Sequence, residues 1–274
     1  MGPNAELVSV IVLARNSAAT IRETIESLLR QTYPHLEILV VDGGSTDSTR
    51  DLVQSFADPR IRIVPQQGRG LGDARNLGVR EARGNYVAYL DSDDVALPRR
   101  IETQLGFLQQ HPDHAVVGSW LRLIDADSAE IATRRYVQND HEIRTAMATL
   151  NVLPNPGIMF RKAVIIDAGL YTEALPEDYD LWLRLMDPRR IDTKMHNLPE
   201  ILTQYRVHLG GSKTQTAKKQ LLWSLQLRYK YWRRGFLRAS PRALLKNLAQ
   251  VCLLALPASW LVSVFRWSVR RGQV

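Results

Sequence analysis

GNYVAYLDSDD, residues 84–94, is the stretch from which the fold of the whole chain can be worked out. Its β-branched and aromatic residues 86–90 predict a buried strand. Three carboxylates follow, at Asp91, Asp93 and Asp94, and open α/β sheets bind ligands beyond the carboxyl ends of their strands. An Asp-x-Asp pair at such an edge is a natural site for Mg²⁺ or Mn²⁺, with substrate phosphates filling the remaining positions. Taken alone, the motif is also typical of a solvated acidic turn.

Three strands and three helices are predicted to alternate before this stretch. Residues 7–13 form a continuous apolar run, typical of a parallel strand buried on both faces, and residues 36–41 and 61–64 predict a second buried strand and a third, short one. A helix is expected after each strand. This alternation predicts an α/β fold with a mostly parallel, Rossmann-like sheet. The chain lacks a Gly-x-Gly-x-x-Gly directly after the first strand and a Gly-x-x-x-x-Gly-Lys-Ser/Thr loop. The pattern therefore favours a nucleoside diphosphate bound through a metal ion over a dinucleotide.

A glycine-rich loop at residues 68–73 precedes the third helix, which we expect from about Ala74 to Ala82. This places Arg75 in the first turn. A helix N-terminus with an added arginine is a favourable binding site for phosphate. The alternative is that Arg75 is an ordinary solvated helix residue.

PEDYDLWLRL, residues 176–185, predicts a helix that begins with Glu177 and Asp178. Acids are common in any first turn, where the helix dipole favours the ionised carboxylate. At the mouth of a metal site, one of them would instead be a general base for an acceptor hydroxyl. His208 follows the last predicted strand and is either a third metal ligand or a loop histidine. Both alternatives stay open for each residue.

The composition is that of an ordinary globular protein. The chain has 274 residues, of which 45% are apolar and 23% charged, enough for one sizeable core with a small appendage. A single cysteine, Cys252, excludes a disulfide framework and is typical of a reducing compartment. The first residues lack the basic region of a signal peptide, so we expect the protein in the cytosol or on the cytoplasmic face of the plasma membrane.

The C-terminal part differs in charge from the rest. No Asp or Glu follows Glu200, while residues 201–274 carry 14 Lys and Arg, which leaves 22 basic against 28 acidic residues in the first 200. Four of the six tryptophans also lie in this part. Its longest uncharged run, residues 247–265, is borderline for a spanning helix, which needs roughly 20 apolar residues.

These features predict two parts: a catalytic domain, residues 1–212, and a helical, basic segment, residues 213–274. We expect the second part to lie in an anionic membrane surface or to dip into it. The alternative is a helical cap on the catalytic domain. No nucleic-acid recognition module accompanies the basic tail, so nucleic acid is not an expected partner.

With these motifs assembled, the chain resembles the inverting, GT-A-fold glycosyltransferases of family 2, in particular bacterial members that build lipopolysaccharide or capsule sugars. The resemblance runs from Val8 to Ser212. It rests on the order and spacing of seven pieces, which are residues 8–12 with Asn16, residues 31–33, 41–47, 74–78 and 91–94, Glu177-Asp178, and residues 205–208.

The resemblance implies a role for each matching residue. Asp93, Asp91 and His208 would form the site for Mg²⁺ or Mn²⁺, with His208 contacting either the metal or the departing diphosphate, and Asp178 would be the catalytic base. Glu177 and Trp182 would contact the acceptor. The nucleotide-sugar donor would lie against Ala14, Arg15, Asp42, Gly43, Arg75, Asp91 and Ser92.

Two motifs depart from the family pattern. Leu13-Ala14-Arg15-Asn16 replaces the usual Pro-x-Tyr-Asn, so an arginine takes the place of the aromatic residue that commonly stacks on the base. Residues 42–45, Asp-Gly-Gly-Ser, lack the second acid of the usual Asp-Asp-Gly-Ser. Arginine can also stack on a base. The donor is therefore left open among UDP-, GDP- and dTDP-sugars.

The predicted function is a metal-dependent, inverting transfer of a sugar from a nucleoside-diphosphate sugar to a hydroxyl of a lipid-linked glycan. One alternative is a sugar nucleotidyltransferase, which should carry a glycine-rich, arginine-containing loop directly after the first strand; residues 13–18 do not match that loop. Another is a non-catalytic membrane-binding protein on a transferase scaffold. Intact Asp91, Asp93 and Asp178 speak against it.

Overall fold

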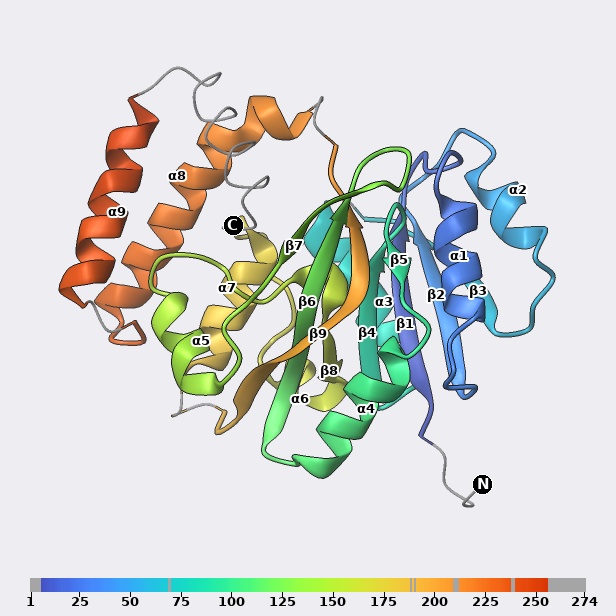
Figure 1. Cartoon of the computed structure of the whole chain (residues 1–274), viewed down its shortest axis with the longest axis horizontal. Coiled ribbons are helices and arrows are strands. Elements are labelled where there is room, and N and C mark those ends of the chain that lie inside the picture. Colours follow the sequence, from blue (N-terminus) through green and yellow to red (C-terminus); the bar gives the residue numbers. More distant parts are fainter. Residues whose placement is uncertain are drawn as a thin grey trace.

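The computed structural model describes residues 6–68, 70–187, 189, 191–208, 212–237 and 240–255. Helices and strands alternate through the first half of the chain, as predicted, and two long helices end the described part (Figure 1). The elements in chain order are β1 Val8–Ala14, α1 Ile21–Leu29, β2 Leu36–Asp42, α2 Thr49–Gln54, β3 Ile61–Pro65, α3 Leu71–Glu81, β4 Tyr86–Asp91, β5 Val95–Ala96, α4 Arg100–Gln110, β6 His114–Ile124, β7 Glu130–Arg134, α5 Asp140–Ala146, η1 Asn155–Gly157, β8 Met159–Arg161, α6 Lys162–Asp167, α7 Glu177–Leu185, β9 Lys194–Arg206, α8 Ser212–Arg233 and α9 Pro241–Leu254.

A single sheet of nine strands runs through the described chain in the order β3-β2-β1-β4-β8-β6-β9-β5, with β7 paired to β6. Strands β3, β2, β1 and β4 are parallel, which confirms the predicted Rossmann-like half. Strand β8 is antiparallel to both β4 and β6, whereas β6 and β9 are parallel. The fold is thus α/β with a mostly parallel sheet, as expected.

Both faces of this sheet are covered. Along β1, Ile11 belongs to the core on the side of α3 and α7, while Val10 and Val12 belong to the core on the side of α1 and α4. All three are fully buried. Side chains alternate across a strand, so a strand covered on both faces is apolar at most of its positions. This explains the continuous apolar runs of the sequence.

The register of the parallel strands aligns their carboxyl ends. Leu13 of β1 lies opposite Asp91 of β4, and Ala14 lies opposite Asp42 of β2. The two acids that end β2 and β4 therefore flank the tip of β1 at one edge of the sheet. This edge is where an open α/β fold binds its ligand.

Helix α3 begins at Leu71, three residues before the predicted start. Gly70 precedes it with a φ of +91°, a conformation that glycine adopts without a steric penalty, so the chain enters the helix directly after the loop. Arg75 consequently lies in the second turn, not the first, and its side chain is buried. The predicted first-turn position of Arg75 was therefore wrong, and so was the alternative of a solvated helix residue.

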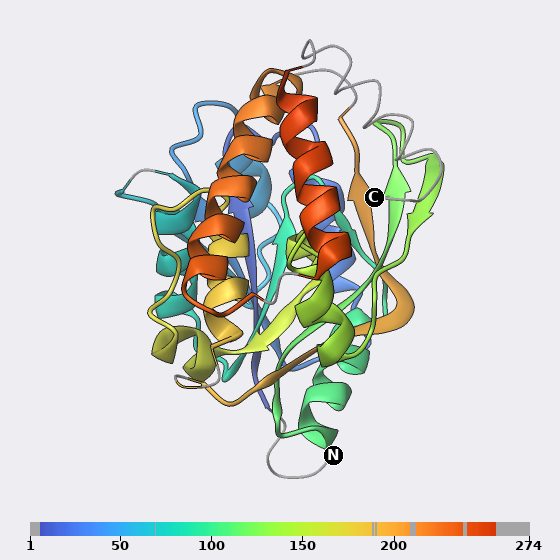
Figure 2. The same ribbon diagram turned by 90° about the vertical axis from the view of Figure 1, so that its left-hand side faces the viewer.

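Helices α8 and α9 form an antiparallel pair beside α7 (Figures 1 and 2). Leu227 and Tyr231 of α8 are buried, so α8 packs on the rest of the protein. The uncharged run at residues 247–265 lies partly in α9, and its residues 256–265 fall outside the described chain. No helix in the described ranges is long and apolar enough to cross a membrane. The division at residues 212 and 213 stays a prediction.

Candidate active site

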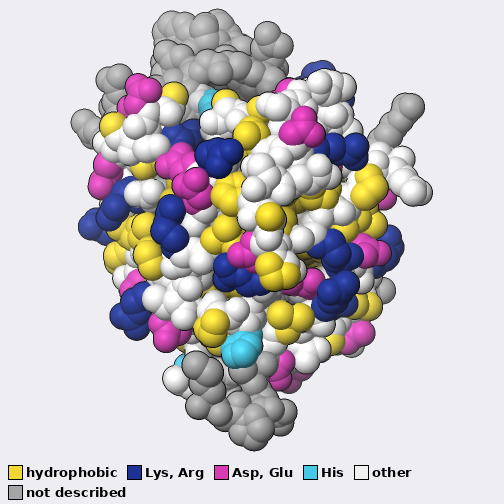
Figure 3. All heavy atoms as spheres, turned by 90° about the vertical axis from the view of Figure 1, so that its right-hand side faces the viewer, with side chains coloured by type: hydrophobic (Ala, Val, Ile, Leu, Met, Phe, Trp, Pro, Cys, Tyr) yellow, Lys and Arg dark blue, Asp and Glu magenta, His cyan; other side chains and the backbone are white. Residues whose placement is uncertain are grey.

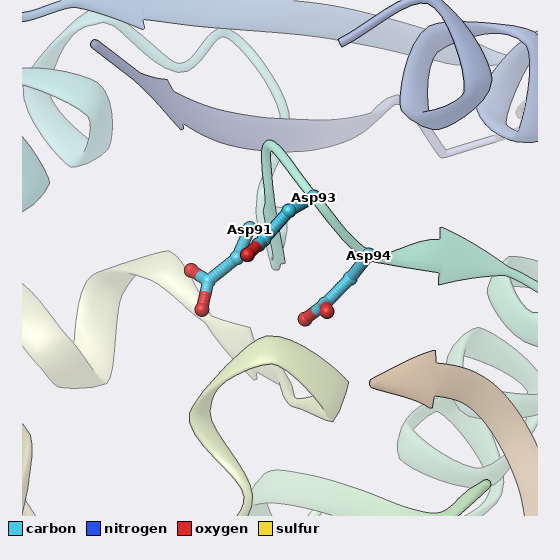
Figure 4. Close-up of side chains that lie close together, drawn as sticks. All are labelled: Asp91, Asp93 and Asp94. Carbon is cyan, nitrogen blue, oxygen red and sulfur yellow. The ribbon is translucent and has the colours of Figure 1, made fainter. Parts of the chain in front are cut away.

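The turn after β4 gathers three carboxylates. Oxygen atoms of Asp91, Asp93 and Asp94 all lie within 4.8 Å of one another, and the three side chains point to the same side of the turn (Figure 4). Asp91 and Asp93 are partly exposed, while Asp94 is fully buried. Like charges this close repel one another, and a bound cation relieves the repulsion. The all-oxygen donor set fits Mg²⁺ or Mn²⁺.

Buried arginines support the cluster from the protein side. The backbone N–H of Arg206 donates to Asp94 Oδ1 at 2.8 Å, and its Nε donates to the carbonyl of Asp93 at 2.9 Å. Arg100, also fully buried, donates to the carbonyl of Tyr89. Burial lowers the pKa of Arg100 to about 10, although the negative charges of Asp94 and Asp91 act to raise it. The sequence placed Asp94 in the carboxylate cluster but did not show that it is buried, and it gave no role to Arg100 or Arg206, because no local sequence pattern marks a charged residue as buried.

His208 lies beside the cluster. Its Nε2 is 2.6 Å from Asp93 Oδ2, and the side chain is 45% exposed. The structure thus brings His208 to Asp93, although the group within 4.8 Å is completed by Asp94 and not by the histidine.

Two adjoining cavities open at the tips of β1 and β4. One, of about 620 Å³, is bordered by Ala14, Arg15 and Gly43. The other, of about 470 Å³, is bordered by Arg75, by Asp91, Ser92 and Asp93 at the end of β4, and by His208 after β9. The residues that line both are Leu13, Arg15, Ser17, Leu71 and Ser92. Most residues predicted for the donor therefore border one continuous hollow.

Asp42 is the exception among these residues. Its side chain is 1% exposed and accepts hydrogen bonds from the Ser45 backbone at 3.2 Å and from Arg50 Nε at 2.7 Å. It lines neither cavity. Asp42 thus shapes the loop after β2 from behind the cavity wall, and a direct contact with the donor was the wrong expectation for this conformation.

Arg75 joins α3 to α7. Its Nε lies 3.2 Å from Glu177 Oε1, and both side chains are less than a tenth exposed. The guanidinium carbon lies 5.3 Å from the ring centre of Tyr89 and 5.5 Å from that of Tyr171. A buried ion pair needs such close partners, because each charge alone would be costly to desolvate. The pair fixes the start of α7 next to the carboxylate cluster.

Asp178, the next residue along α7, has the properties of a base. Its Oδ1 accepts the N–H of Tyr179 at 2.7 Å, and its Oδ2 accepts from Asn151 Nδ2 at 3.2 Å. Burial and the neighbouring charge of Glu177 raise the pKa of Asp178 to about 6, although Arg75 acts to lower it. A carboxylate with a pKa near neutrality is well placed to take a proton from an acceptor.

A third cavity, of about 670 Å³, opens beside Glu177 and Asp178 and adjoins the cavity of the carboxylate cluster, since Leu71 lines both. Part of its wall comes from α8 and α9, which the sequence did not indicate. Trp182 does not reach this cavity. It is fully buried, since α7 is covered on nearly every face, and its large side chain fills the core. The expectation that Trp182 contacts the acceptor was therefore wrong, because its side chain is not exposed to any cavity wall at this site.

These features place the protein among the nucleotide-sugar-dependent glycosyltransferases with a GT-A fold. The mannosyltransferase PcManGT from Pyrobaculum calidifontis, solved with GDP-Man and Mn²⁺, shares the fold with a TM-score of 0.65 and 19% identity over 98% of this chain and 74% of its own. The chain belongs to glycosyl transferase family 2, whose family model matches residues 9–168. This confirms the resemblance found in the sequence and favours a glycosyltransferase over the nucleotidyltransferase alternative.

Two relatives show how far the similarity extends. The UDP-Glc:alpha-D-GlcNAc-diphosphoundecaprenol beta-1,3-glucosyltransferase WfaP of Escherichia coli is 31% identical over 226 residues, which cover 78% of this chain and 82% of that enzyme. An uncharacterized glycosyltransferase of Rickettsia felis is 32% identical over 80% of this chain, and that match spans 38% of the longer protein. The chain is therefore a glycosyltransferase of the kind found in polysaccharide biosynthesis.

Proposed function

We propose that the protein is a metal-dependent, inverting glycosyltransferase that moves a sugar from a nucleoside-diphosphate sugar to a hydroxyl of a lipid-linked glycan. One observation carries the proposal. Asp178, a carboxylate with a pKa raised to about 6, faces a cavity that adjoins the one bordered by Asp91 and Asp93. A single displacement requires a base for the acceptor hydroxyl and a site for the leaving diphosphate. Here these two sites adjoin at Leu71.

The donor would lie in the hollow between β1, β2 and β4. Arg15 would stack on the base above Gly43, where an added Cβ would come 3.5 Å from Arg15 Cβ and 3.3 Å from Gln66 Oε1. Ala14 would border the same pocket. Ser92 would lie against the ribose.

Asp93 and Asp91 would hold Mg²⁺ or Mn²⁺, and His208 would keep Asp93 oriented through its 2.6 Å contact. When bound, the cation would neutralise charge that grows on the departing diphosphate. Arg75 borders this cavity and keeps its positive charge between the diphosphate site and Glu177.

Asp178 would take the proton of the acceptor hydroxyl as that oxygen attacks the anomeric carbon from the face opposite the diphosphate. The bond from the anomeric carbon to the diphosphate oxygen breaks in the same step, so the configuration inverts. This route requires no covalent intermediate on the enzyme. Glu177, held by Arg75, would orient the acceptor beside the base.

The cytoplasmic face of the membrane is the proposed place of action, because the acceptor is lipid-linked. Helices α8 and α9 carry exposed apolar side chains next to basic ones, which favours an anionic lipid surface. The exposed apolar residues of this pair are Leu222, Tyr229, Trp232, Leu244, Leu245, Leu248 and Val251. By contrast, acidic and basic side chains are interspersed on the face of α1 and α2 (Figure 3).

The similarity to WfaP makes UDP-glucose and GlcNAc-diphosphoundecaprenol the first substrates to test. The purified chain would be incubated with Mn²⁺, this acceptor and, in turn, UDP-, GDP- and dTDP-sugars, with the linkage of the product determined by NMR. We expect a β-linked product from an α-linked donor only when a divalent ion is present. A product with retained configuration, or transfer that is unaffected by EDTA, would contradict the proposal.

A further inference from the structure

The cavity beside Asp178 has two unlike walls. One is the start of α7, with Pro176, Glu177, Asp178 and Tyr179. The other belongs to the two C-terminal helices, since its lining residues are Gln220, Leu221, Trp223, Ser224 and Arg228 of α8 and Gln250 and Leu253 of α9. The C-terminal segment, which the sequence analysis expected at a membrane surface, therefore faces Asp178.

Hydrogen bonds fix this second wall to the catalytic body. Asp180, fully buried on α7, accepts from the Tyr231 hydroxyl at 2.7 Å and from Lys230 Nζ at 3.2 Å. Arg228 donates through Nη1 to the carbonyl of Thr149 and through Nη2 to Gln250 Oε1 at 2.6 Å. These contacts tie α8 to α7, to the loop after α5 and to α9. The wall is therefore held in one position relative to Asp178.

The chemistry of the wall matches a sugar. A sugar ring has an apolar C–H face and a rim of hydroxyls, so a site for it combines an aromatic surface with side-chain amides and hydroxyls. Trp223 is half-buried in this wall, and Gln220, Ser224 and Gln250 supply polar groups beside it. Asn151 adds an amide on the side of Asp178. The volume of about 670 Å³ lies within the roughly 300–1,000 Å³ of small-molecule sites.

We propose that α8 and α9 complete the acceptor site, with Trp223 stacking on the acceptor sugar whose hydroxyl Asp178 deprotonates. The inference rests on the proposed glycosyl transfer and assigns part of its specificity to the C-terminal helices. The acceptor is recognised here through its sugar, and its lipid lies outside this cavity. The donor site does not include Trp223.

Steady-state kinetics of the full chain tests this inference. The acceptor is a GlcNAc-diphospho lipid made with either the undecaprenyl chain or a short alkyl chain, and the donor is the nucleotide sugar that the wild type uses. Trp223→Ala should raise the acceptor KM about 10-fold, the equivalent of about 1.4 kcal/mol, with both acceptors. The donor KM and the slow hydrolysis of donor by water should not change. Trp223→Phe should recover most of the loss, since it keeps an aromatic face.

Trp232→Ala is the matched control, because Trp232 lies on the same helix but lines a different cavity. It should leave the acceptor KM unchanged with the short-chain acceptor. An unchanged acceptor KM in Trp223→Ala would overturn the inference, and so would a loss confined to the undecaprenyl acceptor, which would indicate a lipid contact. Loss of donor hydrolysis in Trp223→Ala would also overturn it, since Trp223 would then act through the fold. A wild type that neither transfers nor hydrolyses any nucleotide sugar would refute the proposed function itself.

Discussion

Replacing Asp178 by asparagine should separate stability from activity. The pKa of Asp178 rises from its ordinary 3.8 to about 6 in the folded protein, which corresponds to about 3 kcal/mol in favour of the protonated form. The native state thus holds this proton more tightly than the unfolded chain does. The contribution of Asp178 to the free energy of unfolding is therefore fully present below pH 4 and is lost as the pH rises through about 6.

An amide cannot ionise, so Asp178→Asn avoids this loss. Above pH 6 the variant should be more stable than the wild type by up to about 3 kcal/mol, and the difference should shrink toward zero near pH 4. Its transfer activity should fall by about 10²–10⁴-fold, because the general base is gone. In the wild type, kcat/KM should rise with pH through about 6 and then level off.

Urea unfolding of both proteins at several values between pH 4.5 and 8 measures the difference directly. Asp180→Asn, two residues further along α7, is a matched control, because the pKa of Asp180 is shifted in the opposite direction to that of Asp178. Although burial acts to raise it, the pKa of Asp180 is lowered by hydrogen bonding to the Tyr231 hydroxyl and by the charge of Arg184. Asp180→Asn should therefore destabilise the protein at pH 7, and less so as the pH falls. If Asp178→Asn is less stable than the wild type at every pH, or still transfers sugar, our account of Asp178 is wrong.

Three further predictions concern other parts of the molecule. Asp93→Ala should abolish the Mn²⁺-dependent rise in Tm on addition of the nucleoside diphosphate; an unchanged shift would exclude Asp93 as a ligand. Arg75→Met should lower the free energy of unfolding by about 3–5 kcal/mol, because it leaves Glu177 buried without its partner. Adding Glu177→Gln should restore most of that loss. Equal stability of the single and double variants would refute the pairing. Replacing three exposed basic residues of α8 and α9, Arg233, Arg242 and Lys246, by Gln should reduce co-sedimentation with anionic vesicles. Undiminished binding would remove these helices from the membrane proposal.

The outline of the fold and the position of the carboxylate cluster could be predicted from the sequence. Strand β4 and the three acids at its end lie within one short stretch of sequence, and the apolar runs of β1 and β2 mark strands covered on both faces. The acids that open α7 were found in the same way, at the start of a periodic helix. Each of these features depends on neighbours within a few residues, which a sequence displays directly.

What each side chain faces was decided by the tertiary structure. Arg75 forms an ion pair with Glu177, a residue about a hundred positions away. Asp42 forms an ion pair with Arg50, and the side chain of Trp182 is buried in the core. The wall of the Asp178 cavity formed by Trp223 has the same origin. The periodicity of a helix shows which residues share a face, but it does not show which other element covers that face. Only the packing of distant segments determines which polar groups are buried together, and therefore which of them border the site.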